Sequence, residues 1–191
     1  MCGRYEVVIE ESELRDILFS AMSEEDADTG SYIVGGEVFP TNILPVVTNT
    51  DGMRTPRMYK WGFPQYKGNG VIINARSETI EIKPMFANRF RYTRCLVPSS
   101  GFYEWSRQTR QKYMFRMPED NVLYMAGLCG EFGGERSYVI ITADANESVR
   151  NVHERMPVVL RRDELDEWLF DTNSARLLLR GDLPQLECIA V

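Results

Sequence analysis

The chain has 191 residues, of which 43% are hydrophobic, and a formal net charge of −6. This length and hydrophobic content suffice for one core, so we expect a single domain over residues 1–191. The acidic balance excludes a generic basic nucleic-acid coat, because non-specific affinity depends on phosphate neutralisation by Lys and Arg. Any nucleic-acid site must therefore be local.

The hydrophobic pattern predicts many short strands with helices inserted between them. A strand is expected at residues 3–9, a helix opens at Ser12 and Glu13, and an acidic loop covers residues 24–30. Further strands are expected at 38–39, 43–47, 57–61, 71–74, 95–97, 101–105, 112–117, 122–128, 137–142 and 187–191, and helices at 83–91, 146–152, 163–170 and 174–179. This order favours an α+β fold with a strongly curved, barrel-like antiparallel or mixed β-sheet core flanked by short helices.

Targeting and metal signals are missing from the sequence. The apolar runs are strand-sized, far below the roughly 20 residues of a membrane-spanning helix, so we expect no membrane partner. The N-terminal residues lack the basic start and apolar stretch of a secretory signal, which predicts a cytoplasmic protein. The four cysteines are widely spaced and His153 is the single histidine. We therefore expect reduced thiols, no metal and no cofactor.

Cys2 is the residue to which the sequence assigns the most specific chemistry. Initiator methionine is normally removed before a small second residue, so the mature chain is expected to begin at Cys2 with a free α-amine. An amine condenses with an aldehyde to an imine, and a thiol on the adjacent carbon can then close a five-membered thiazolidine. A cysteine at this position also arises by chance as a small semi-buried thiol. The assignment therefore depends on partner residues.

Three polar segments beside strands supply candidate partners. Asn74 ends an apolar strand, where its amide can orient a carbonyl or an amine, although a turn followed by a surface Arg76 is the alternative. Glu104 is flanked by aromatic residues and suits general acid–base work, or else it is an exposed strand position that alternates with core residues. His153 belongs to the residue type that titrates near neutral pH, but a lone histidine is more often structural. Arg155 is either a phosphate contact or a plain surface arginine.

Eight short blocks carry a resemblance that no single motif establishes. They are Met1-Cys2-Gly3-Arg4-Tyr5, Phe39-Pro40-Thr41-Asn42, Trp61-Gly62, Asn74-Ala75-Arg76-Ser77-Glu78, Arg94-Cys95-Leu96-Val97-Pro98, Gly101-Phe102-Tyr103-Glu104-Trp105, Thr142-Ala143 and His153-Glu154-Arg155-Met156-Pro157. In this order they resemble the SOS response-associated peptidase (SRAP) family, whose members shield abasic sites in single-stranded DNA.

The resemblance implies a function and a set of site residues. It implies that the chain senses abasic sites in single-stranded DNA and forms a covalent thiazolidine crosslink through Cys2, largely in a single turnover, after self-processing removes Met1. It implies that Asn74 positions Cys2 and that Glu104 and His153 act as acid–base groups. The implied DNA contacts are Arg4, Arg76 and Arg155 for phosphates, Trp61 for stacking, and Pro40 and Thr142 for the groove wall. A cytoplasmic monomer that joins the nucleoid when bound to DNA is expected.

The sequence departs from the family after Trp61-Gly62. Members often have a longer loop with a further Trp there, whereas this chain continues Phe63-Pro64-Gln65-Tyr66-Lys67-Gly68. In the family an aromatic side chain wedges against the base next to the abasic site. Phe63 or Tyr66 is the candidate to replace the absent Trp in that role.

In the mechanism suggested by these residues, the Cys2 amine attacks the aldehyde of the ring-opened abasic site. Water then leaves with a proton from Glu104 or His153, and the thiolate closes the ring. Two other functions stay open: a thiol peptidase acting on other proteins, and a non-catalytic module that binds single-stranded DNA. The former would cleave added peptides over many turnovers, and binding by the latter would not depend on an aldehyde.

Overall fold

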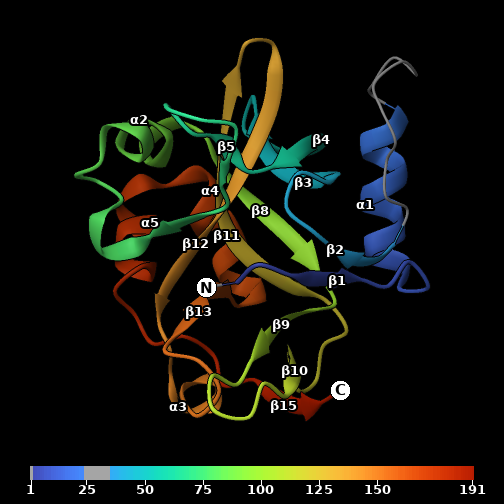
Figure 1. Ribbon diagram of the computed structural model, residues 1–191. Coiled ribbons are helices and arrows are strands. Elements are labelled where there is room, and N and C mark those ends of the chain that lie inside the picture. Colours follow the sequence, from blue (N-terminus) through green and yellow to red (C-terminus); the bar gives the residue numbers. More distant parts are fainter. Residues whose placement is uncertain (1, 24–34) are drawn as a thin grey trace.

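A closed five-stranded β-barrel forms the core of the computed structural model, which describes residues 2–23 and 35–191 (Figure 1). Around the barrel the strands are β12 (Glu135–Asp144), β4 (Met53–Trp61), β3 (Ile43–Thr50), β8 (Arg94–Ser99) and β11 (Leu123–Phe132). β11 pairs with β12 and closes the ring. The β12–β4 pair is parallel and its neighbours around the barrel are antiparallel. The predicted barrel-like mixed sheet is confirmed.

A second sheet of five strands lies against the barrel. Its order is β15 (Glu187–Ala190), β10 (Lys112–Arg116), β9 (Gly101–Trp105), β1 (Tyr5–Val7) and β2 (Gly36–Val38). β1 pairs antiparallel with both of its neighbours, so that Tyr5 lies opposite Phe102 on one side and Val38 on the other. An added Cβ at Gly101 would collide with the Phe115 carbonyl oxygen, so this close approach at the start of β9 requires glycine.

The second half of β12 supports the segments that matter for the site. β7 (Asn74–Arg76) pairs with it in parallel, and β13 (Arg155–Pro157) pairs with it antiparallel. β14 (Val159–Leu160) pairs with β11, and β5 (Phe63–Pro64) forms a small hairpin with β6 (Val71–Ile72). Residues 74 and 155, which are far apart in the chain, are thereby attached to one strand.

Short helices lie around the barrel, except that α3 lies at the bottom of the view near β13 and β15 (Figure 1). They are α1 (Ser12–Ser23), α2 (Pro84–Tyr92), α3 (Glu147–Arg150), α4 (Leu165–Phe170) and α5 (Thr172–Leu178), with 3-10 turns η1 (Ser77–Thr79) and η2 (Arg162–Glu164). α1 buries Leu14, Leu18 and Ala21, at the spacing expected for one helix face, and packs against β3 and β4. Among the described residues, no helix has the length and apolarity needed to cross a bilayer.

Most expected elements are present, and the differences have local causes. The strand expected at 101–105 has those bounds, whereas the helix expected at 163–170 is divided into η2 and α4. β13 and β14 were not expected, because strands of three and two residues carry no periodic pattern and depend on pairing with β12 and β11. The acidic loop expected at 24–30 lies outside the described residues.

Candidate functional site

Cys2 lies three residues before the start of β1, where the second sheet meets the strands attached to β12. The Asn74 side-chain nitrogen Nδ2 donates a hydrogen bond of 2.9 Å to the Cys2 carbonyl oxygen. Cys2 is fully buried, and its Sγ lies 3.7 Å from the Arg4 carbonyl oxygen. Because β7 is fixed to β12, the Asn74 amide holds the N-terminal segment at a defined position on the barrel.

Glu104 reaches the same place from β9. The backbone N–H of Tyr103 donates to the Arg4 carbonyl oxygen at 2.9 Å, which continues the pairing of β9 with the N-terminal segment. Glu104 is buried, and its negative charge acts on Cys2. Burial first, and then the Glu104 carboxylate, raise the pKa of the Cys2 thiol. The thiol is therefore protonated at neutral pH, with a carboxylate close enough to influence its ionisation.

Asn74 has unused hydrogen-bonding capacity at this site. Its Oδ1 atom is buried and accepts no hydrogen bond from the described residues. A buried amide oxygen left in this state costs about 1–3 kcal/mol, so such atoms are uncommon in folded chains. Since Nδ2 of the same amide already binds the Cys2 carbonyl oxygen, Oδ1 is a ready acceptor for an N–H or O–H group beside Cys2.

His153 lies on a neighbouring segment, between α3 and β13. It is buried, and its Nδ1 accepts a hydrogen bond of 3.0 Å from the Arg155 backbone N–H. Nδ1 also lies 3.1 Å from the Arg155 carbonyl oxygen, so the Arg155 backbone fixes the orientation of the ring, and the direction of hydrogen bonding depends on the tautomer. An ion pair of 2.8 Å between Arg107 and Glu154 ties the turn after β9 to this segment. The structure thus brings Cys2, Asn74 and Glu104 together and attaches the His153 segment to the end of β9.

A mixed cationic and aromatic surface adjoins Cys2. The Arg4 guanidinium carbon lies 4.0 Å from the centroid of the Phe39 ring and 5.2 Å from that of Trp105, and it pairs with Glu37 at 3.0 Å. Phe39 and Trp105 are 42% and 36% exposed, and Pro40, next to Phe39, is partly buried. The sequence analysis did not predict Phe39 and Trp105 as site residues. Their positions inside the motif blocks, adjacent to Pro40 and to Glu104, could have indicated that role.

Trp61 lies in the core, so it presents no surface on which a nucleobase could stack in this structure. It has no exposed surface and packs between Tyr5 and Tyr138, with ring centroids 5.2 Å and 6.4 Å away. Phe63 is also fully buried, which removes it as a replacement wedge. Tyr66, in the segment between β5 and β6, is 94% exposed and stays a candidate.

Arg155 and Thr142 also differ from their predicted surface roles. The buried guanidinium of Arg155 binds both carboxylate oxygens of Glu78, pairs with Asp144 at 2.7 Å and donates to the Thr142 carbonyl oxygen at 2.7 Å. Arg155 therefore clamps η1 to β12 and β13, and a phosphate would have to displace a carboxylate to reach it. Thr142 is fully buried. Arg76, in contrast, is exposed and forms no ion pair within the described part of the chain.

The described residues contain no group of three or more His, Cys, Asp or Glu side chains suited to hold a metal ion. All four cysteines are free thiols, and Cys188 is exposed whereas Cys2, Cys95 and Cys129 are buried.

Comparisons with known proteins agree in sequence and in fold. A model of the family described as SOS response associated peptidase (SRAP) matches residues 1–191. The abasic site processing protein YoaM of Bacillus subtilis is 30% identical over 210 residues, covering 100% of this chain and 91% of that protein. HMCES of Xenopus tropicalis, also named an abasic site processing protein, is 36% identical over 55% of this chain and 38% of its own length. A crystal structure from Bordetella bronchiseptica has a TM-score of 0.76 at 23% identity and covers 100% of this chain and 99% of that one, which establishes likeness of fold.

Proposed function

The chain belongs to the SOS response associated peptidase (SRAP) family, and from this premise we propose that it processes abasic sites in single-stranded DNA by crosslinking them to Cys2. Relatives that are 30% and 31% identical over most of their length carry the name abasic site processing protein. The observation that carries the proposal is the arrangement at Cys2: the Asn74 amide binds its carbonyl oxygen, and the Glu104 carboxylate acts on its thiol.

The proposed sequence of steps begins with the amide bond between Met1 and Cys2. Hydrolysis of that bond consumes one water and releases methionine, leaving a free α-amine on Cys2. Met1 lies outside the described residues, so this step follows from the chemistry of the product. An amide nitrogen is not nucleophilic, whereas a free amine condenses with an aldehyde.

The amine then attacks the aldehyde carbon of the ring-opened abasic sugar. The carbinolamine loses water to form an imine, the Cys2 sulfur adds to the imine carbon, and the thiol proton ends on the nitrogen. The overall change joins aldehyde and aminothiol with loss of one water. Because the thiol is protonated at rest, ring closure requires a base, and the Glu104 carboxylate is the neighbouring group suited to take that proton.

Asn74 and His153 complete the proposed assignment. Asn74 holds the Cys2 carbonyl oxygen through Nδ2, and its Oδ1 would accept a hydrogen bond from the new amine and aim the nitrogen lone pair at the aldehyde. His153, whose ring is oriented by the Arg155 backbone through Nδ1, would protonate the departing oxygen. Arg4 and the exposed Arg76 would bind phosphates, while Phe39 and Trp105 supply the aromatic surface that single-stranded binding uses.

The test is intact mass before and after incubation with abasic single-stranded DNA. We expect a chain without Met1 that gains the mass of the oligonucleotide less one water. Cys2→Ala should lose the heat-stable adduct while non-covalent affinity stays within about twofold. Cys188→Ala is the matched control and should crosslink normally, because an internal cysteine has no adjacent free amine.

A heat-stable adduct in Cys2→Ala would disprove the mechanism. Cleavage of added peptides over many turnovers would indicate a thiol peptidase instead. A chain that carries an uncleaved peptide before Cys2 should also form no adduct.

A further inference from the structure

A groove of about 280 Å³ is lined by residues that follow Asn74 and Arg76 in the chain, and it takes no part in the chemistry assigned above. It runs between η1 and α5, and its polar lining consists of Ser77, Glu78, Glu81, Arg176 and Arg180. η1 follows β7 without interruption. The groove therefore begins at the residue after the exposed Arg76, which itself is two residues after Asn74.

Both acidic residues of the groove are neutralised by buried or half-buried arginines. Glu78 is bound by Arg155, and Glu81 by Arg176 through Nε at 3.0 Å and Nη2 at 2.7 Å. These hydrogen bonds lower the pKa of both carboxyl groups. Both are thus ionised at neutral pH. The Arg176 guanidinium binds Glu81, and the Arg155 guanidinium is shared between Glu78 and Asp144.

Further arginines leave the groove with an excess of positive charge. Arg76 acts on Glu78, and Arg180 and Arg91 act on Glu81, so all three lie within electrostatic reach of the lining. Each is exposed, and none forms an ion pair within the residues that the structure describes. In a chain with a net charge of −6, this is a local basic surface.

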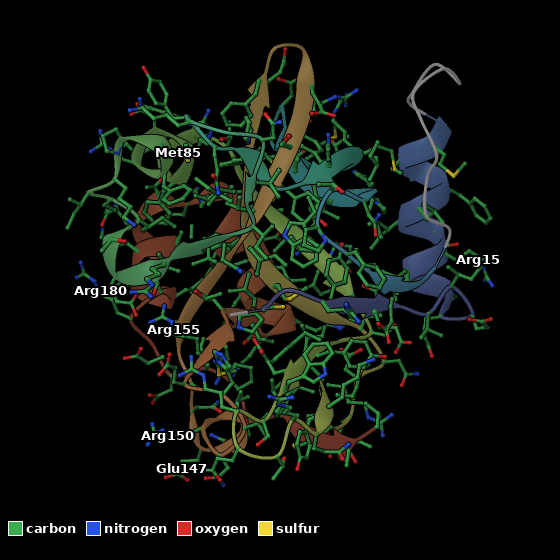
Figure 2. The ribbon with its side chains drawn as sticks, in the orientation of Figure 1. Arg15, Met85, Glu147, Arg150, Arg155 and Arg180 are labelled. Atoms are coloured by element: carbon green, nitrogen blue, oxygen red, sulfur yellow. The ribbon has the colours of Figure 1, made fainter. Side chains whose placement is uncertain are left out.

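The groove lies on the side of the molecule that carries Arg155. Figure 2 shows Arg155 and Arg180 on the same side, whereas Arg15 of α1 lies at the opposite edge. Glu78 connects Arg155 to the groove, because it binds Arg155 and also lines the groove together with Arg180. A strand with its abasic site at Cys2 would meet Arg76 first and the groove next.

We propose that this groove binds the phosphodiester backbone of the DNA strand that flanks the abasic site, with Arg180 as its principal phosphate contact. The proposal rests on the proposed function, because it needs a strand anchored at Cys2. Arginine at such a surface offers forked donors that match phosphate oxygens, and each phosphate contact adds to the salt dependence of affinity.

The experiment compares Arg180→Glu with Arg15→Glu on three oligonucleotides. One is about five nucleotides long with a central abasic site, and the other two extend it by about ten nucleotides on the 5′ or the 3′ side. Arg15 is a matched control because it is exposed and forms no ion pair with described residues. Affinity is measured by fluorescence anisotropy over a salt series, crosslink yield on a denaturing gel, and folding of each variant by thermal unfolding.

We expect Arg180→Glu to weaken binding of one extended strand about fivefold to tenfold and to reduce the salt slope by about 0.7 to 1. Affinity and crosslinking on the short oligonucleotide should not change, and Arg15→Glu should behave as the unmodified chain does. Three outcomes would overturn the groove assignment. Arg180→Glu could bind every strand as tightly as the unmodified chain does, it could lose as much affinity for the short oligonucleotide as for the extended ones, or Arg15→Glu could lose as much affinity as Arg180→Glu. Absence of any adduct with the unmodified chain would overturn the proposed function instead.

Discussion

Cys2 and the aromatic core around Trp61 are both buried, but the polar atoms of the two regions are used differently. In the core, Trp61 Nε1 donates to the Ile73 carbonyl oxygen at 3.1 Å, and the hydroxyl groups of Tyr5 and Tyr138 bind each other at 2.6 Å. At the Cys2 site, Asn74 Oδ1 is buried without a donor among the described residues, and a carboxylate lies near a thiol.

Whether the buried polar atoms have hydrogen-bond partners distinguishes a packed interior from a site that can bind and react with a substrate. A satisfied polar group in the core stabilises one arrangement, whereas an unsatisfied buried acceptor and a buried carboxylate cost folding free energy. Such costs concentrate at functional sites, where substrate groups supply the absent partners. Burial alone therefore does not distinguish the two regions, while the state of their polar atoms does.

Removing the charge at the Cys2 site should have the largest effect. Glu104→Gln keeps the shape of the side chain but cannot take a proton, so we expect crosslinking to slow about 10²–10⁴-fold. The carboxylate raises the pKa of the Cys2 thiol, and its loss should let the thiol titrate at lower pH. Single-turnover kinetics and the ultraviolet absorbance of the thiolate, each against pH, measure the two effects.

Glu131→Gln is the control for that substitution, since Glu131 is exposed on β11. It should alter neither the rate nor the titration. A Glu104→Gln variant that titrates at higher pH would contradict the electrostatic account.

Truncation in the aromatic core should reduce stability rather than chemistry. Trp61→Ala removes a fully buried ring between two tyrosines, and we expect the free energy of unfolding in urea to fall by about 3–5 kcal/mol. Trp61→Phe should stay folded and bind abasic DNA normally. Weakened binding in a folded Trp61→Phe chain would restore a DNA-contacting role for Trp61.

Trp105→Ala should affect binding rather than stability, with little loss in the free energy of unfolding and about 1–3 kcal/mol weaker binding of abasic DNA.

The smallest effect is expected from the tyrosine pair. Tyr5→Phe leaves the Tyr138 hydroxyl buried without its partner, so we expect a loss of about 1–3 kcal/mol in the free energy of unfolding. The double change Tyr5→Phe with Tyr138→Phe should cost less than the sum of the single changes, because neither hydroxyl is then left alone. Additive losses would show that the 2.6 Å contact contributes no coupling.

Local chemistry and local pattern were predictable from the sequence. The proposed aminothiol of Cys2 follows from its place next to Met1 in the sequence, and the strand at 101–105 follows from alternation and the glycine at its start. The curved mixed sheet was predictable in kind, because many short strands with turn signals cannot form regular βαβ winding. β13 and β14 were not, since two or three residues contain no period.

What each side chain faces was decided only by the tertiary structure. Trp61 and Trp105 both end strands, but β4 closes into the barrel and turns Trp61 onto Tyr138, whereas β9 lies in the second sheet and leaves Trp105 partly exposed. Arg76 and Arg155 likewise look alike in the sequence, and only the pairing of β7 and β13 with β12 exposes one and clamps the other. The physical reason is that burial and ion pairing arise from strands distant in sequence, so residue type and spacing determine which groups are available and long-range packing determines which of them meet.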